Sequence, residues 1–505
     1  MLMSTKHGTL SAMKIRYYIW VYVVLTIAII SCSQAPTVEI DKSEPSTTVD
    51  VKATETPPST NITEQNTISS LNNSNASTDT SIAPPTLTPA HDSINAGQLA
   101  LRNSNWQAAI DSYILALDQT DEDDELHLDA HLGLAHSYLR SKAMWTALET
   151  LETFEANHPT AYNIADAIFL LGLTNHQLGN HTIAIQYFDQ YLEQYPNIID
   201  SYVLELSGDA YRSLAKYSTS ADYYESAILK PRGTNINFLL LDKAEVLQAA
   251  GQTSESITLF DLVATNTKYD NTRAQMDYKR AKTMVAANQI NTAIQYYKHA
   301  VNTYPESYYS YLSLVELLSY GTIVNEFQRG LIDYHADQHT PAILAFRRYL
   351  STNPDHDAQA HYYMALSYRN LDNIAAAKLH FQEIIDTHPN DPLWGEAWLE
   401  IAYTQWGWED NYSGAVSNLR DMVSTYPKHS MTPEILFYAA RIAERGKYLE
   451  TASDLWGQVA DNYPNTKLGP EAAFLSGITS YRQDNFAEAE RRFSQSIELN
   501  QGDDS

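Results

Sequence analysis

Several residue types are scarce in this sequence of 505 residues. Cys32 is its only cysteine, so no disulfide can form within the chain. Glycine is sparse, with 18 residues, and no run alternates Val, Ile or Thr with polar residues, which argues against a β-sheet protein. Basic residues are outnumbered, 33 Lys and Arg against 61 Asp and Glu, which gives a formal net charge of −28. Such a charge argues against nucleic acid as a partner, and leaves solubility or a basic partner as its explanation.

Catalytic and metal-binding signatures are also missing from the sequence. The 16 histidines form no His-Glu-x-x-His motif, and there is neither a glycine-rich nucleotide loop nor a Gly-x-Ser-x-Gly motif. The nearest approach to a metal cluster is Asp355-His356-Asp357 with His361. It follows Pro354 in a predicted loop, and we interpret it as solvated. We therefore expect no catalytic residue, no metal and no cofactor.

The N-terminus has the pattern of a targeting signal. Basic residues precede an apolar segment of 14 residues, 17–30, which is too short to span a bilayer comfortably. The segment ends in Ile29-Ile30-Ser31-Cys32, which resembles the bacterial lipobox, whose cysteine is lipidated. The resemblance implies a signal peptide over residues 1–32, membrane attachment through lipidated Cys32, and an extracytoplasmic, membrane-anchored lipoprotein of a bacterium. The alternative is an ordinary signal peptide or an uncleaved anchor.

The next segment, residues 33–92, is rich in Ser, Thr, Pro and Asn and nearly lacks aromatic residues. Such a composition cannot offset the entropy of folding, so we predict a disordered tether. About 60 residues of flexible chain have a root-mean-square reach on the order of 40 Å.

A repeated pattern occupies the chain from residue 93 onward: Ala or Ser, with an aromatic residue or leucine four residues later. The pattern recurs at intervals of 35 to 38 residues, except for one interval of 49. Its first positions are Ala109, Ala147, Ala184, Ser220, Ser256, Ala293, Ala342, Ala377, Ala415, Ala452 and Ala489. A small residue commonly stands twelve residues earlier, and seven copies have a proline twelve residues later. Each copy predicts two amphipathic helices, the second ended by proline, which need further copies to bury their apolar faces.

This pattern resembles the tetratricopeptide repeat family, which has a small residue, a later Ala-x3-Phe and a closing proline in a helix–turn–helix unit. The resemblance covers residues 93–500 and implies an all-α fold, a right-handed superhelical solenoid of about eleven repeats. Endings such as Gln194-Tyr195-Pro196 and Asn462-Tyr463-Pro464 resemble the long-period repeats of bacterial envelope lipoproteins, including outer-membrane assembly factors.

The long interval divides the array into repeats 1–6 over residues 93–305 and repeats 7–11 over residues 326–505. Between them, residues 306–325 predict one extra apolar helix near 306–320. Its Tyr308-Tyr309-Ser310-Tyr311-Leu312 run resembles the superhelical, non-catalytic region of soluble lytic transglycosylases, which act on peptidoglycan. No Gly-rich segment containing Met-Gln follows Glu306-Ser307 as it does in their catalytic module. The alternative is a spacer helix that fills a break in the stacking.

Stacked first helices are expected to line a concave face. By resemblance to the family, side chains three before and one and four after the small residue point into it. The candidate groove residues are Phe169, His176, Arg212, Tyr278, Phe327, Tyr334, Tyr362, Arg369, Phe437, Phe474 and Tyr481. They predict an aromatic groove for an extended peptide or a glycan strand, with two arginines as polar handles. The alternative is that the aromatic side chains pack between adjacent first helices.

Trp406-Gly407-Trp408 lies at a predicted turn, where the tryptophans would either anchor a partner or cover the local core. We predict a non-catalytic scaffold, anchored in the membrane, that mediates protein–protein interaction in the cell envelope. Its expected partner is a protein or peptide, with peptidoglycan as the alternative. A different interpretation is the N-terminal superhelical part of a peptidoglycan lytic transglycosylase without its catalytic domain, because the sequence stops soon after a second helix.

Overall fold

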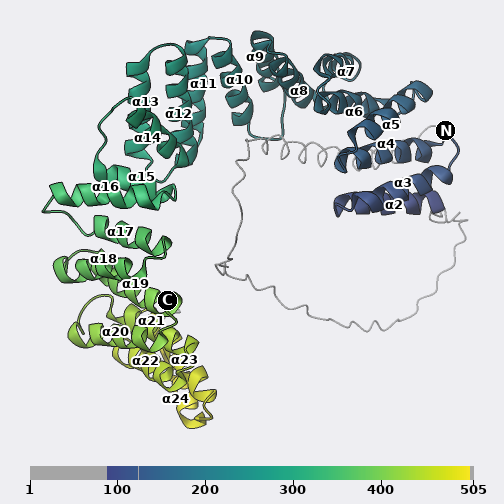
Figure 1. Ribbon diagram of the computed structural model, residues 1–505. Coiled ribbons are helices and arrows are strands. Elements are labelled where there is room, and N and C mark those ends of the chain that lie inside the picture. Colours follow the sequence, from purple (N-terminus) through teal and green to yellow (C-terminus); the bar gives the residue numbers. More distant parts are fainter. Residues whose placement is uncertain (1–87, 123, 501–505) are drawn as a thin grey trace, which may run out of the picture. The chain divides into compact units, whose positions relative to one another are not determined.

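The computed structural model describes residues 88–122 and 124–500, and these residues form 23 helices and no strand (Figure 1). The predicted signal peptide with Cys32, and nearly all of the predicted tether, lie outside the described residues. In the described part of the chain, no helix has both the length and the apolar character needed to cross a membrane. The described residues divide into two compact units, 88–214 with Leu229–Arg232, and Ala215–Ile228 with 233–500.

The first unit begins, in its described part, at Pro89, within the last residues assigned to the tether. Its helices are α2 Pro89–Arg102, α3 Trp106–Asp118, α4 Glu125–Arg140, α5 Met144–Asn157, α6 Ile164–Gln177, α7 His181–Gln194 and α8 Asp200–Ser213. Consecutive helices pair as hairpins, and each hairpin packs on the next.

The second unit continues the same pattern. Its helices are α9 Tyr217–Ile228, α10 Asn237–Ala249, α11 Thr253–Asn266, α12 Asp270–Ala286, α13 Ile290–Thr303, α14 Tyr308–Ser319, α15 Glu326–His335, α16 His339–Thr352, α17 Gln359–Asn370, α18 Ile374–Thr387, α19 Leu393–Gly407, α20 Tyr412–Thr425, α21 Thr432–Arg445, α22 Leu449–Asn462, α23 Leu468–Tyr481 and α24 Phe486–Asn500. The all-α array of about eleven hairpins with one extra helix is confirmed. The fourth predicted hairpin, α8 with α9, is divided between the two units.

In four hairpins a glycine of the first helix lies against an aromatic side chain sixteen residues later, at Gly97 and Tyr113, Gly172 and Phe188, Gly330 and Phe346, and Gly477 and Phe493. A Cβ atom at Gly172 in α6 would lie 2.6 Å from Cε1 of Phe188 in α7, so a methyl group there would collide with the ring. Alanine holds this place in other hairpins, as Ala135 does before Leu151, and both of these side chains are fully buried. The repeat spacing in the sequence therefore reflects one packing contact that recurs in several hairpins.

A single residue with left-handed backbone geometry reverses the chain between paired helices. In the α6–α7 turn Gly179 has a φ of +83°, and the amide of Asn180 donates to the carbonyl of Asn175 at 2.8 Å, which caps α6. In most of the other hairpin turns the residue is not glycine, as at Lys142 and Lys447, whose φ angles are 65° and 64°. The use of other residues at these turns explains how a long array forms with few glycines.

The extra helix α14 packs against α12, α13 and α15. Its Leu314 and Leu317 are buried in one cluster with Tyr297 of α13 and Ile332 of α15. The hydroxyl of Ser310 donates to the carbonyl of Ala300 at 2.9 Å. These contacts fit a spacer helix that covers the apolar surfaces of the hairpins on either side.

Candidate binding surface on the first helices

Two of the predicted groove residues lie in the core. Phe169 is 1% exposed and packs with Tyr191, and Phe437 is 7% exposed and packs with Trp456. Both contacts join the two helices of one hairpin, and the apolar rings gain more from this burial than from exposure to water. These two side chains therefore belong to the core and do not line a groove.

In the first unit, the other two candidates have partners within the chain. His176 is partly buried, with its Nδ1 3.3 Å from Nδ1 of His181, and burial lowers the pKa of His176. Arg212 forms an ion pair with Asp209 at 2.7 Å. A partner that bound Arg212, as predicted, would therefore have to compete with Asp209 for its guanidinium.

In the second unit, four aromatic candidates are partly buried. Tyr278 packs on Tyr297, with ring centroids 6.0 Å apart, and Phe327 packs on Phe346, with centroids 5.8 Å apart. Tyr334 of α15 and Tyr362 of α17 both contact the ring of Tyr363, at 5.0 Å and 5.8 Å. Phe474 and Tyr481 of α23 are 49% and 58% exposed. The aromatic candidates thus range from core residues to exposed ones.

Arg369 is not available as a simple handle for a ligand carboxylate. It is 8% exposed and donates to Oε2 of Glu400 at 2.5 Å and to Thr404 Oγ1 at 3.3 Å. Its guanidinium carbon also lies 4.9 Å from the ring centroid of Trp408 and 5.1 Å from that of Tyr403. The charge is therefore paired with α19 and enclosed by aromatic rings.

We call the residues around this arginine the Arg369 patch: Tyr362, Arg369, Glu400, Tyr403 and Trp408. Tyr362 joins it because its hydroxyl donates to Oε1 of Glu400 at 3.3 Å. Burial, and then the Glu400 charge, raise the pKa of Tyr362, so the phenol remains a hydrogen-bond donor at neutral pH. The patch is a fixed network that joins α17 to α19.

The two tryptophans of the α19 turn differ in exposure. Trp406 is partly buried beside Tyr403, and the guanidinium carbon of Arg445 lies 4.9 Å from its ring centroid. Trp408 is 41% exposed. Trp406 thus covers the local core, whereas the role of partner anchor remains a prediction for Trp408.

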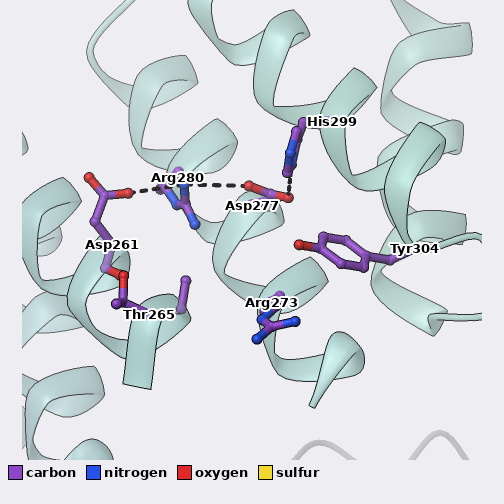
Figure 2. Close-up of a pocket in the computed structure, with 8 residues that line it drawn as sticks. Asp261, Thr265, Arg273, Asp277, Arg280, His299 and Tyr304 are labelled. Atoms are coloured by element: carbon purple, nitrogen blue, oxygen red, sulfur yellow. Dashed lines mark hydrogen bonds and ion pairs between the residues drawn. The ribbon is translucent and has the colours of Figure 1, made fainter. Parts of the chain in front are cut away.

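Sequence reasoning did not find a polar pocket of about 320 Å³ between α11, α12 and α13 (Figure 2). Asp277 is 2% exposed there, accepts a hydrogen bond from Nδ1 of His299 at 2.6 Å and lies 3.5 Å from Arg280. Arg280 also pairs with Asp261 at 3.0 Å. Burial raises the pKa of Asp277, and the hydrogen bond from His299 opposes this shift. The dashed lines of Figure 2 connect Asp261 and His299 through Arg280 and Asp277.

The pocket contains a paired aspartate and histidine, which in hydrolases orient a nucleophile. Among the residues that line it, the aliphatic hydroxyl is that of Thr265, which donates instead to the carbonyl of Asp261 at 2.8 Å. Asp277 is held between Arg280 and His299, and this arrangement suits a structural network between hairpins better than nucleophilic catalysis.

Two family models match parts of the chain. The outer membrane lipoprotein family YfiO matches residues 88–202, from α2 into α8. The tetratricopeptide repeat (TPR) model matches residues 276–307 and 359–391, which fall on the hairpins α12–α13 and α17–α18. The chain is a TPR protein. Both families are generally non-catalytic scaffolds, which supports a protein-interaction scaffold with protein partners, and the YfiO match points to an envelope lipoprotein.

The TPR protein is also similar to solved structures. A tetratricopeptide repeat protein from Parabacteroides merdae is 14% identical, with a TM-score of 0.35, over 55% of this chain and 98% of that one. Pseudomonas aeruginosa pilF is 19% identical, with a TM-score of 0.34, over 46% of this chain and 97% of that one. Because these TM-scores are below 0.5, the repeat assignment rests on the family models and the helices. No curated protein matches the sequence.

Proposed function

We propose that this TPR protein is a lipid-anchored scaffold of the bacterial cell envelope, which holds a protein partner on the first helices of its second unit. The outer membrane lipoprotein match over residues 88–202 supports the location. The basic and apolar residues before Cys32 support attachment through a lipidated cysteine. The tether would then let the folded units reach a partner away from the membrane surface.

The Arg369 patch is the observation that carries the binding proposal. Trp408 presents an indole that is 41% exposed, and the guanidinium of Arg369 supports its ring at 4.9 Å. Arg369 is itself held by Glu400 at 2.5 Å. A side chain fixed in this way loses little conformational entropy on binding, and tryptophan is among the commonest anchors of protein interfaces. We therefore expect an apolar or aromatic side chain of the partner to pack on Trp408.

Photo-cross-linking in intact cells tests this surface. A photoreactive phenylalanine analogue placed at Trp408 should give one discrete cross-linked species that contains a second protein. The matched control is the same analogue at Leu379, which is 64% exposed on the second helix α18 of the same unit. Equal cross-linking at both positions, or none at Trp408, would contradict binding at the patch. Cross-links to glycan strands alone would replace the protein partner with peptidoglycan.

Membrane attachment is tested separately. The Cys32→Ala variant should move from the membrane fraction to the soluble fraction and should lose incorporation of a labelled fatty acid. The unaltered protein should stay in the membrane fraction after a high-salt wash, because an acyl chain is not released by ionic strength. Retention of the variant in washed membranes would refute the lipid anchor. That result would have no bearing on the binding surface, which the cross-linking experiment tests.

A further inference from the structure

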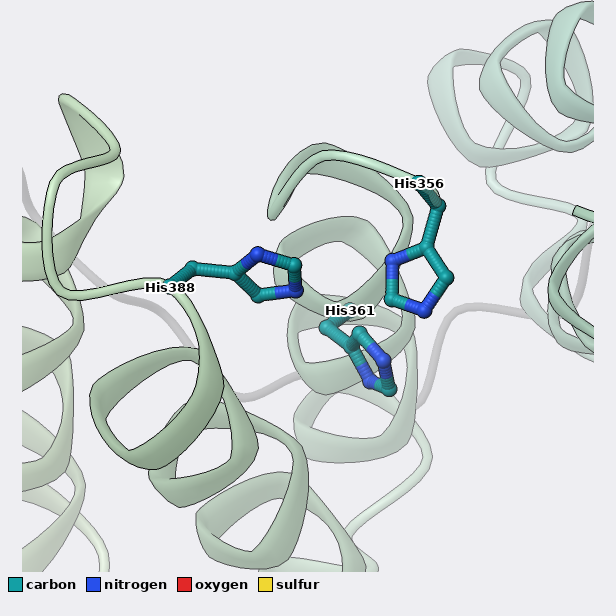
Figure 3. A group of neighbouring side chains, drawn as sticks. All are labelled: His356, His361 and His388. Atoms are coloured by element: carbon teal, nitrogen blue, oxygen red, sulfur yellow. The ribbon is translucent and has the colours of Figure 1, made fainter. Parts of the chain in front are cut away.

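Three histidines meet at one end of the α17–α18 hairpin, two of them close in the sequence and the third separated from them by α18. His356 lies in the loop before α17, His361 in the first turn of α17, and His388 directly after α18 (Figure 3). One ligand atom from each lies within 4.8 Å of the others. In the described part of the chain, this is the one group of three metal-ligating side chains that comes so close.

We propose that His356, His361 and His388 bind a divalent transition-metal ion, with Zn²⁺ as the first candidate. Three imidazole nitrogens form a donor set that suits Zn²⁺ and leave a fourth position for water. Zinc–nitrogen bonds of 2.0–2.1 Å place tetrahedral ligands about 3.4 Å apart. The nitrogen atoms therefore have to approach by up to about 1.4 Å, which would require rotation of the rings and a small movement of the loop that carries His356.

In two of the rings, those of His361 and His356, Nδ1 already has a hydrogen-bond partner. Nδ1 of His361 lies 3.1 Å from Nδ1 of His380, and Nδ1 of His356 lies 3.0 Å from the carbonyl oxygen of Asp357. In both rings this arrangement leaves Nε2 for the metal. Ligand histidines usually have such a partner on the second nitrogen, which orients the ring.

The third ring has a buried nitrogen without a partner. Nε2 of His388 is buried and makes no hydrogen bond. A buried polar atom in this state is unfavourable, and coordination to a metal ion would satisfy it. Figure 3 shows the ring of His388 turned toward the other two. Its site has access from solvent, because His356 and His388 are only partly buried while His361 is 8% exposed.

A second histidine cluster in the first unit provides an internal comparison. His131 of α4 and His158 after α5 hold the same places in their hairpin as His361 and His388 hold in theirs. There, His127 is the third ring, with its centroid 6.2 Å from His131 and 6.4 Å from His158. This cluster does not bring three ligand atoms together, so histidine packing alone does not produce the arrangement at His356.

Titration of the full chain with Zn²⁺ tests the site. The protein carries no polyhistidine tag, is first treated with EDTA, and is titrated by calorimetry in competition with a chelator. We expect one ion per chain, and about 100-fold or greater loss of affinity in His356→Asn. This variant lies in a partly exposed loop and should fold normally. Co²⁺ in place of Zn²⁺ should give visible absorption bands of nitrogen ligation, which the variant should lose.

The matched control is His131→Asn, which removes the corresponding histidine of the other cluster and should leave Zn²⁺ affinity unchanged. His380→Gln should weaken binding by about 10-fold, because it removes the hydrogen bond to the ligand His361. The proposal is overturned if the unaltered chain binds no Zn²⁺, if His356→Asn binds it as tightly, or if His131→Asn weakens binding equally. These measurements do not depend on any protein partner or on membrane attachment.

Discussion

Substitution of Gly172 by alanine perturbs the contact on which the α6–α7 hairpin closes. The new methyl carbon would lie 2.6 Å from Cε1 and 2.7 Å from Cδ1 of Phe188, whose side chain is fully buried. Because the ring is enclosed by the core, we expect the two helices to move apart. Overpacking of this kind costs about 1–3 kcal/mol, while the better helix propensity of alanine returns about 1 kcal/mol. We expect a net loss of about 1 kcal/mol in the free energy of unfolding.

The control substitution is Gly407→Ala in α19, where the nearest atom to the added methyl is Tyr403 Cε2 at an ordinary 3.5 Å. It should leave stability unchanged or slightly higher. The double variant Gly172→Ala/Phe188→Leu recreates the Ala135–Leu151 pair of the preceding hairpin. We therefore expect it to be more stable than the sum of the two single changes by about 1 kcal/mol.

Urea unfolding followed by circular dichroism measures these differences as shifts in midpoint. Hydrogen exchange then shows whether the loss is confined to α6 and α7, as expected for an array in which hairpins contact only their neighbours. The reasoning would be refuted if Gly172→Ala were as stable as Gly407→Ala, or if the double variant showed no recovery.

Three further predictions concern other contacts. Arg369→Met should lower the free energy of unfolding by about 3 kcal/mol, because it leaves the partly buried Glu400 without its charged partner. Arg482→Met, at a more exposed ion pair, should change this free energy by less than about 1 kcal/mol. Lys447→Gly should raise it by up to about 1 kcal/mol, because φ at this turn is 64°. Burial lowers the pKa of His131 from 6.5 to about 4, so the unfolded chain binds a proton that the folded chain does not, and stability should fall from pH 6.5 toward pH 4. His131→Asn should remove about 2 kcal/mol of this decline.

Thermal and urea unfolding monitored by circular dichroism, at several pH values for His131, check all three. Equal losses at Arg369 and Arg482 would show that burial does not set the strength of the pair. A less stable Lys447→Gly would mean that the turn carries no strain. An unchanged pH dependence in His131→Asn would assign the acid sensitivity to other groups.

The fold was predictable from the sequence because one contact repeats in it. The interval between Gly172, Ala184 and Phe188 recurs along the chain, and it specifies two helices, their facing surfaces and their separation. The interval of 49 residues likewise indicated α14. What the repeat could not indicate is the division of the chain between α8 and α9, since both helices keep the repeat pattern.

The candidate site was less predictable because the exposure of a side chain depends on the neighbouring hairpin. Phe169 and Tyr481 were assigned to one surface, yet the first is 1% exposed and the second 58%. The pairing of Arg369 depends on Glu400, which belongs to the next first helix. Local spacing does not encode such contacts.

We noted His356 and His361 together from the sequence but not His388, although the sequence contains a signal for it. His361 and His388 are 27 residues apart, and so are His131 and His158. In both hairpins the two positions are brought close together. A search for metal ligands at equivalent places of the repeat, rather than within one short stretch, would have found His388.

The single helix α14 limits how such a chain can change its length. Elsewhere in the described residues the helices form whole hairpins whose closing contacts lie within the hairpin, as between Gly172 and Phe188. Duplication or loss of one hairpin therefore leaves the closing contacts of the others in place. Removal of α14 would instead expose Tyr297 on one side and Ile332 on the other. Engineered or evolved variants of this protein should therefore gain and lose pairs of helices at many places, but should retain this unpaired one.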